Sequence, residues 1–300
     1  MTRSLFAALT LSALIQTAGR SEQAAPTATK SPNHPIPKST RLYVLDCGTL
    51  DIADTGRFRL KREEVSTDKL SVACFMIAGP KGTLMWDTGA VPDSAVPPGG
   101  GPSKVRIVLP GSEERYVTMR KSLKAQLADA GYAPSDVTHL AVSHYHYDHT
   151  ANSNDFTVAT WLVRQVERDA MFAAKLPDLV QPSSYDALRK SRTVIIRSDE
   201  HDVFGDGSVV IKLAPGHTPG HQVLLVKLAK TGPVVLSGDL YHYPEERTLK
   251  RVPTFEFDEA QTVAARATVD AFLKKTGAAL WIQHDVNADA KLKKAPAYYE

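Results

Sequence analysis

Three histidines and one aspartate lie close together in the segment 143–149, which reads SHYHYDH and directly follows a predicted strand. In an extended chain the side chains of His144 and His146 point the same way, whereas Asp148 and His149 fall on the turn into the next element and point to an adjacent spot. Imidazole and carboxylate groups suit zinc, although nitrogen and oxygen ligands alone do not select one divalent metal sharply. The cluster therefore predicts a metal site with room for two cations.

A metal site of this kind needs further ligands from elsewhere in the chain. Three candidates stand where predicted strands end, namely His217, Asp239 and His284. His217 lies in the turn-rich segment 214–221 (APGHTPGH), between two predicted strands. Glycines beside His217 and Asp239 let the backbone approach closely. We therefore expect these three side chains to complete the site.

The elements that must position these residues are short strands interrupted by a few helices. Strands are predicted near 41–47, 70–78, 82–86, 105–109, 138–142, 157–162, 193–197, 208–213, 221–228, 233–237 and 279–283. Helices are predicted at 116–130, at 161–175 or its later part, and at 258–275. The segments 90–111 and 241–257 are expected to be long loops, and the aromatic residues of the second favour a role in covering the site and setting substrate choice.

Length and composition are those of an ordinary globular protein. The 300 residues can bury a full core, and 43% apolar with 23% charged residues excludes a disordered chain or a multi-span membrane protein. A net charge of +3, from 36 Lys+Arg against 33 Asp+Glu, is too weak to indicate nucleic-acid binding. We therefore expect no nucleic-acid partner.

The first 25 residues have the pattern of an export signal peptide, with Arg3 before the uncharged run 4–15 and small residues after it. The alternatives are a short buried helix or a membrane anchor, but the run is far shorter than the ~20 apolar residues of a spanning helix. Residues 26–40 contain four prolines and are predicted to be an extended leader to a single domain at 41–300. We expect a periplasmic or secreted protein without stable membrane insertion after cleavage.

Export bears on the two cysteines, Cys47 and Cys74, which lie in two predicted strands that could be neighbours. A disulfide between them is one possibility, because exported proteins keep such bonds. Two buried free thiols are the other, and the expected one, since a core of this size does not depend on a covalent cross-link.

Taken in order, these motifs resemble the metallo-β-lactamase superfamily. That family's pattern is an H-x-H-x-D-H cluster followed by a His, an Asp and a final His, which this chain matches at 144–149, His217, Asp239 and His284. Asp87, in the segment WDTG, is similar to the family's early aspartate. The resemblance implies an α/β fold, an αββα sandwich of two mixed β-sheets flanked by helices.

Within the superfamily, the segments 215–222 (PGHTPGHQ) and 237–239 (SGD) look most like the dinuclear zinc N-acyl homoserine lactonases. That resemblance implies two zinc ions, or other divalent metals, with these ligands: His144, His146 and His217 for one, Asp148, His149 and His284 for the other, and Asp239 as a bridge. Asp87 would orient a ligand imidazole from outside. His221 either does likewise or makes an ordinary hydrogen bond at a strand start.

The chemistry that this implies is hydrolysis by a metal-bridging hydroxide, without a side-chain nucleophile. Asp148 or Asp239 would carry the proton. The family's lactonases also place a tyrosine that stabilises the oxyanion three residues beyond the bridging aspartate, but position 242 of this chain is a histidine. Tyr241 and Tyr243 flank that position, and we assign the catalytic role to Tyr241.

The leading hypothesis is a lactonase that opens N-acyl homoserine lactones, with a small-molecule lactone or ester as its substrate. The alternative is a periplasmic metallo-β-lactamase or a broad ester or lactone hydrolase. A thioester hydrolase and a metal-binding module without turnover are further interpretations. Asp239 separates the first two, because β-lactamases with the H-x-H-x-D-H cluster lack a bridging carboxylate at this place. The sequence leaves acyl-chain preference, native metal and oligomeric state open.

Overall fold

The computed structural model describes Met1, residues 36–109 and residues 114–300. The predicted signal peptide (1–25), apart from Met1, and most of the predicted leader (26–40) lie outside these residues. Among the residues that are described, no helix has the length and apolar character that a membrane span requires.

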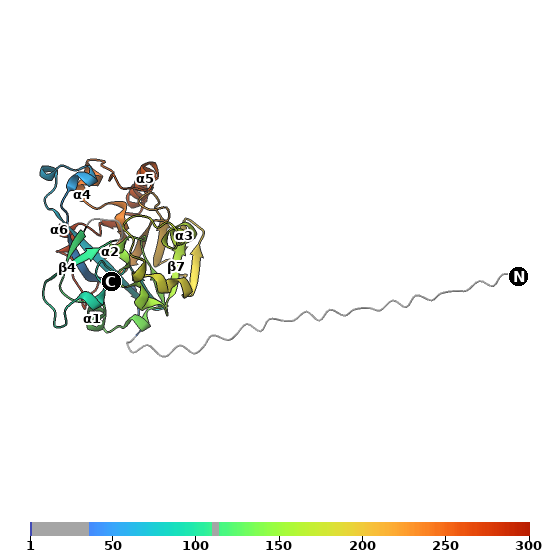
Figure 1. The fold of residues 1–300 in the computed structure, drawn as a ribbon. Coiled ribbons are helices and arrows are strands. Elements are labelled where there is room, and N and C mark those ends of the chain that lie inside the picture. Colours follow the sequence, from blue (N-terminus) through green and yellow to red (C-terminus); the bar gives the residue numbers. More distant parts are fainter. Residues whose placement is uncertain (2–35, 110–113) are drawn as a thin grey trace. The chain divides into compact units, whose positions relative to one another are not determined.

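Two mixed β-sheets form the centre of the fold, which confirms the predicted fold class (Figure 1). The spatial order is β4-β5-β1-β2-β3-β6-β7-β8 in the eight-stranded sheet and β13-β12-β11-β10-β9 in the five-stranded sheet. The strands of the first sheet are β1 (Arg41–Asp51), β2 (Lys69–Gly79), β3 (Gly82–Trp86), β4 (Ser103–Val108), β5 (Glu114–Met119), β6 (His139–Ala141), β7 (Thr160–Arg164) and β8 (Thr193–Ile196). Those of the second are β9 (Glu200–Asp202), β10 (Val209–Leu213), β11 (Gln222–Leu228), β12 (Gly232–Leu236) and β13 (Ala279–Trp281).

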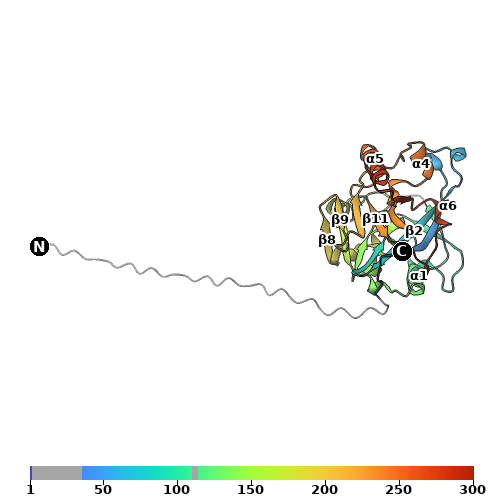
Figure 2. The same cartoon turned by 180° about the vertical axis from the view of Figure 1, so that it is seen from behind.

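Short α-helices and one long one lie in the connections between strands, except α6, which follows the last strand (Figure 2). They are α1 (Leu123–Asp129), α2 (Tyr147–Thr150), α3 (Gln165–Met171), α4 (Pro244–Thr248), α5 (Glu259–Thr276) and α6 (Val286–Asp289). The long helix α5 begins where the sequence predicts it, because the Asp258 side chain accepts a hydrogen bond from the Gln261 amide. It ends at Gly277, which has a left-handed conformation. The segment 241–257 contains α4, so it is not a plain loop as expected.

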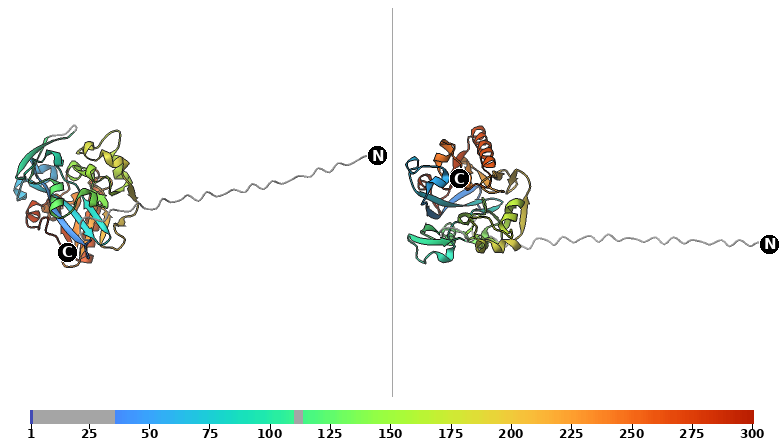
Figure 3. Two further views of the ribbon diagram at one scale, coloured as in Figure 1. Left: turned by 90° about the horizontal axis from the view of Figure 1, so that it is seen from below. Right: turned by 45° about the horizontal axis from the view of Figure 1, so that its top comes forward.

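Alternation of side chains along the strands divides the core into layers. In β1, Leu42 and Val44 belong to a cluster between the two sheets, whereas Tyr43 and Leu45 belong to a cluster that includes residues of α1 and α3. In β11 the same alternation places Val223 and Leu225 in a third cluster, with α5. Two sheets packed face to face with helices outside them, as Figure 3 shows from two directions, are the expected αββα sandwich.

The predicted helix at 116–130 is wrong in its first half. Residues Glu114–Met119 form strand β5, which pairs with β4 and β1, and the helix begins only at Leu123. Ser122 caps that helix with its side chain. Burial of β5 alternates around Val117, so the period of this segment is that of a strand. Strand β9 was not predicted either.

Cys47 and Cys74 form a disulfide, so the expectation of two free thiols is wrong. Strands β1 and β2 pair antiparallel, with a register shift between Asp46 and Thr49, and the two cysteine Cα atoms are 5.8 Å apart. The disulfide lies against Gly89, where an added Cβ would come within 3.0 Å of the Cys47 Cβ. It therefore packs directly against the turn that follows β3.

Candidate metal centre

The carboxyl ends of five strands meet at one edge of the sandwich. Strands β3 and β6 run parallel in the first sheet, and β12 and β13 run parallel in the second. Strand β10 has the same direction as β12, because both are antiparallel to β11. The segments that follow these strands carry Asp87, His144, His146, Asp148, His149, His217, Asp239 and His284. Residues far apart in the sequence therefore meet here.

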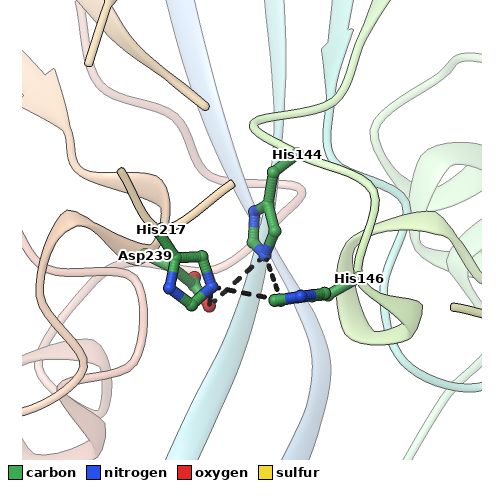
Figure 4. A group of neighbouring side chains, drawn as sticks. All are labelled: His144, His146, His217 and Asp239. Carbon is green, nitrogen blue, oxygen red and sulfur yellow. Dashed lines mark hydrogen bonds and ion pairs between the residues drawn. The ribbon is translucent and has the colours of Figure 1, made fainter. Parts of the chain in front are cut away.

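A first group of four side chains consists of His144, His146, His217 and Asp239, whose ligand-type atoms all lie within 4.8 Å of one another. The Nδ1 atom of His146 is 2.8 Å from Nε2 of His144 and 3.1 Å from Nε2 of His217. Figure 4 shows the three rings and the carboxylate turned toward one another. All four residues are buried. We call this set the first group.

A second group consists of Asp148, His149 and His284, again with ligand-type atoms within 4.8 Å of one another and all buried. Asp239 also reaches this group, since its Oδ1 lies 3.0 Å from Nε2 of both His149 and His284. Its Oδ2 lies 3.3 Å from Nε2 of His217, in the first group. Asp239 therefore presents one oxygen to each group.

Several buried polar atoms at the meeting point of the two groups have no hydrogen-bond partner among the described residues. They are Nε2 of His149, Nε2 of His284 and Oδ1 of Asp239. Buried nitrogen and oxygen atoms of this kind are costly unless something binds them. Imidazole nitrogens and a carboxylate are suitable donors for a divalent cation. The residues present thus fit two metal ions that share Asp239.

The outward nitrogen of three imidazoles is held by the protein. Nδ1 of His149 is 2.9 Å from Oδ2 of Asp87, and Nδ1 of His217 is 2.9 Å from Oε1 of Glu256. Nδ1 of His284 is 2.6 Å from the backbone carbonyl oxygen of Ser71. Such contacts fix the ring and leave Nε2 free to bind a metal.

Asp87 is at the centre of a buried network, as its expected role requires. Its Oδ1 accepts a hydrogen bond from the Ser143 amide at 2.5 Å, and its Oδ2 accepts one from the Gln283 side chain at 2.8 Å. The Gln283 oxygen in turn accepts from the Gly238 amide at 2.8 Å. Gln283 links the turns before both Asp239 and His284, and nothing in the sequence singled it out.

His221 positions the backbone of Asp239. Its Nδ1 donates to the Ala214 carbonyl oxygen at 2.8 Å, and its Nε2 accepts from the Asp239 amide at 2.9 Å. Burial lowers the pKa of His221 to about 4, so the ring is neutral and Nε2 can accept. A Cβ at Gly238 would lie 2.6 Å from that Nε2, which explains the glycine.

Charge is concentrated on Asp239. Burial raises the pKa of its carboxyl, but the surrounding imidazoles, His149 foremost, hold that pKa well below the usual range. Burial also lowers the pKa of His144 and His146 well below its ordinary value, so both rings are neutral. For His217 the effect of burial is outweighed by Glu256 and Asp239, which raise its pKa to about 9.

Tyr241 is not brought to the two groups, which corrects the role expected for it. Its ring is buried in the core cluster with α5 and lies under the Arg266 guanidinium, 4.3 Å from the ring centroid. The side chain that lies beside the two groups is that of His242, whose Nε2 is 3.1 Å from Oδ2 of Asp239. Adjacent residues of an extended segment point in opposite directions, so only one of the two can face the site.

A cavity of about 670 Å³ opens above the two groups. His146, Asp148, Asp239, His242 and His284 line its floor. Its walls include these apolar side chains: Leu50, Phe58, Leu70, Tyr147, Leu179 and Phe255. Charged side chains line the cavity as well, Arg57, Asp68 and Lys69 among them. The apolar part of the wall beside the polar floor fits a ligand with an apolar chain and a polar reacting end.

A model of the metallo-beta-lactamase superfamily matches residues 67–280 of the chain. Among curated proteins, the N-acyl homoserine lactonase AttM of Azorhizobium caulinodans is 30% identical over 272 residues, which cover 87% of this chain and 98% of that protein. An N-acyl homoserine lactonase from a Bacillus species is 30% identical over 236 residues, which cover 76% of this chain and 87% of that protein.

Solved structures show the same fold. A mutant of Bacillus thuringiensis AiiA with N-decanoyl-L-homoserine at its active site superposes with a TM-score of 0.72, at 22% identity, over 87% of this chain and all of that one. AidC, described as a dizinc quorum-quenching lactonase, superposes with a TM-score of 0.61, at 17% identity, over 88% of this chain and 94% of that one.

Proposed function

The chain belongs to the metallo-beta-lactamase superfamily and is a metal-dependent hydrolase, and we propose that it opens the ring of N-acyl homoserine lactones. The observation that carries the proposal is the position of Asp239, with one carboxylate oxygen toward each group. The matching lactonases support the choice of substrate.

We propose that the resident metal is zinc, two ions per chain. His144, His146 and His217 would hold one ion, Asp148, His149 and His284 the other, and Asp239 both. The chemistry that such a pair supplies is a hydroxide at neutral pH and a polarised carbonyl group.

The chain's own residues supply binding and proton transfer. Asp148 belongs to the second group and also lines the cavity. Its carboxylate is therefore placed to take up the proton that the attacking water releases. The apolar walls, with Leu179 and Phe255 among them, would exclude water from an acyl chain. His149 and His217 are kept in place by Asp87 and Glu256.

We also propose that the protein acts in the periplasm or outside the cell. The disulfide between Cys47 and Cys74 supports this, because such bonds persist in oxidising compartments and are rare in the cytosol. Fusing residues 1–40 to a reporter that is active only after export tests the proposal, and a reporter that stays in the cytoplasm would contradict it.

One assay separates the lactonase from its alternatives. A zinc-loaded sample is given short-chain and long-chain acyl homoserine lactones, a simple ester and a cephalosporin reporter. We expect ring opening of the lactones to have the highest kcat/KM and the cephalosporin to be a poor substrate. Faster hydrolysis of the cephalosporin would identify a β-lactamase, and faster hydrolysis of the ester would identify a broad esterase.

A further inference from the structure

His242 is a buried imidazole on the floor of the cavity that belongs to neither group. Its ring is stacked on that of His284, with centroids 5.5 Å apart and planes at 3°. The edges of Phe58 and Phe255 contact it at centroid distances of 5.0 and 5.5 Å. The ring therefore has a fixed orientation although it is not in the set of predicted ligands.

Both nitrogens of His242 face carboxylates. Nε2 lies 3.1 Å from Oδ2 of Asp239, and Nδ1 lies 3.3 Å from Oε1 of Glu246. A carboxylate can only accept, so the Nε2 atom meets Asp239 with an N–H. That Asp239 oxygen also lies 3.3 Å from Nε2 of His217 in the first group. His242 also lines the cavity. An ion held by the first group would bind this Asp239 oxygen, and the N–H of His242 would then be available to a ligand in the cavity.

Glu246 and Arg266 hold this ring from behind. Glu246 is fully buried, and its Oε2 accepts a hydrogen bond from the Arg266 guanidinium at 2.6 Å. Its Oε1 accepts from the backbone amide of His242 at 3.3 Å. Arg266 also donates to the Leu240 carbonyl oxygen at 2.8 Å, so α5 is tied to the turn that carries His242. The backbone of His242 is therefore tied to a buried ion pair, and the Glu246 carboxylate lies behind the Nδ1 atom of the ring.

We propose that His242 is a catalytic residue of the lactone opening: its Nε2–H donates a hydrogen bond to the carbonyl oxygen of the lactone. When hydroxide adds to the carbonyl carbon, the π pair of the C=O bond moves to that oxygen, and the hydrogen bond stabilises the charge. No proton leaves His242. When the ring C–O bond breaks afterwards, its electron pair goes to the ring oxygen, which takes up the proton that Asp148 holds. Glu246 and Arg266 are positioning residues. This inference rests on the proposed function and identifies a residue that recognises the lactone carbonyl.

The test compares His242→Leu, which removes the donor, with His242→Gln, which keeps an N–H. We expect His242→Leu to lower kcat by about 10²–10³ with little change in KM, the cost of losing one oxyanion donor. His242→Gln should recover part of that loss. The control is His201→Leu on the edge strand β9, outside the cavity lining, which should leave kcat unchanged.

Two readouts besides activity separate this role from metal binding. Metal content should stay at the wild-type value in both His242 variants, and the visible spectrum of the cobalt-substituted protein should not change. Loss of an ion or a changed cobalt spectrum would make His242 a ligand and overturn the proposal. Full activity of His242→Leu would overturn it as well. Failure of the wild type to open any lactone would refute the proposed function itself, and with it this role.

A double-mutant cycle tests the positioning residue. Glu246→Gln alone should lower kcat, because the ring loses its anchor, but Glu246→Gln added to His242→Leu should cause little further loss. Additive losses would overturn the link between Glu246 and His242. If Glu246→Gln does not fold, the comparison of His242→Leu with His242→Gln still decides the catalytic role.

Discussion

Glu256 and His217 are joined by a hydrogen bond of 2.9 Å between the carboxylate Oε1 and the imidazole Nδ1. Glu256 is near the end of the segment 241–257, whose first turn carries His242. Its neighbour Phe257 donates a backbone hydrogen bond to the His217 carbonyl oxygen at 3.2 Å. Both ends of the segment thus contact residues of the metal centre.

Glu256→Gln should weaken metal binding by about 10–100-fold, as expected when the outer partner of a ligand imidazole is lost. The first group should be affected and the second spared, because His149 and His284 have other partners. Competition with a chromophoric chelator measures this. Glu259→Gln, at an exposed site paired with Arg59, is the matched control. Equal affinities for the variant and the wild type would refute the role of Glu256.

We expect about two divalent ions per chain at neutral pH. The seven side chains of the two groups, with Asp239 shared, supply enough donors for two sites of four to five ligands when bound water is included. Elemental analysis after reconstitution with zinc measures the ratio. A value of one or less would contradict the dinuclear site.

Asp239→Asn should lower kcat by orders of magnitude while the protein keeps its fold. The amide retains the shape of the carboxylate but loses the negative charge that faces both groups. Kinetics together with circular dichroism check the two parts of this expectation. Asp270→Asn, on the exposed side of α5, is the control. Wild-type activity in Asp239→Asn would remove this residue from the mechanism.

Leu179→Ala should weaken the binding of long-chain acyl lactones more than that of short-chain ones, because Leu179 lines the apolar wall of the cavity. Each methylene that is no longer covered is worth about 0.8 kcal/mol, so two of them change KM roughly tenfold. A chain-length series measures the effect. Leu176→Ala, at an exposed position outside the lining, should have none. Equal losses for all chain lengths would mean that the acyl chain lies elsewhere.

The stability contributed by Glu167 should fall as pH rises from about 4.5 to about 7. Burial raises its pKa to about 7 from an ordinary 4.5, although the Tyr145 and Gly220 amides donate hydrogen bonds to it. Between these values the unfolded chain has lost a proton that the folded chain keeps, so the unfolding free energy decreases with pH, by about 3 kcal/mol at most.

Urea unfolding of the wild type and of Glu167→Gln at pH 5 and pH 7.5 checks this. Both proteins contain the same metal ligands, so the contribution of these ligands cancels when the two unfolding free energies are subtracted. As pH rises, the unfolding free energy of the wild type should fall relative to that of the variant. Glu259→Gln should show no such shift, because this residue is exposed. A difference that is the same at both pH values would show that Glu167 is ionised throughout.

The local cluster at 144–149 could be predicted from the sequence because spacing within a few residues fixes which side chains are neighbours. His217, Asp239 and His284 could be added because each follows a strand, and strands of one direction end at one edge. The two-sheet fold was expected from the resemblance to the metallo-β-lactamase superfamily, which these motifs carry. The ligand predictions depend on the spacing of neighbouring residues and on which residues follow a strand, and they need little knowledge of tertiary contacts.

Other parts of the site could not be predicted, because they depend on the geometry of turns. Whether Tyr241 or His242 faces the cavity is decided by the backbone after Asp239, and a difference of one residue exchanges the two. The disulfide between Cys47 and Cys74 depends on how strands β1 and β2 pair. Glu256 carries no motif, and only the folded chain brings it to His217.

Hydrogen-bond acceptors of the protein hold the ligand imidazoles in place. Folding alone therefore arranges the nitrogen and oxygen donors of the site. Asp87, Glu256 and the Ser71 carbonyl oxygen hold three rings at fixed angles through contacts within the protein. A rigid set of nitrogen and oxygen donors binds first-row divalent ions in a general order, manganese weakest and copper strongest. Nitrogen and oxygen donors alone do not select one divalent metal sharply. The identity of the bound metal therefore depends on the supply of ions in the compartment where the chain folds as well as on the donors themselves.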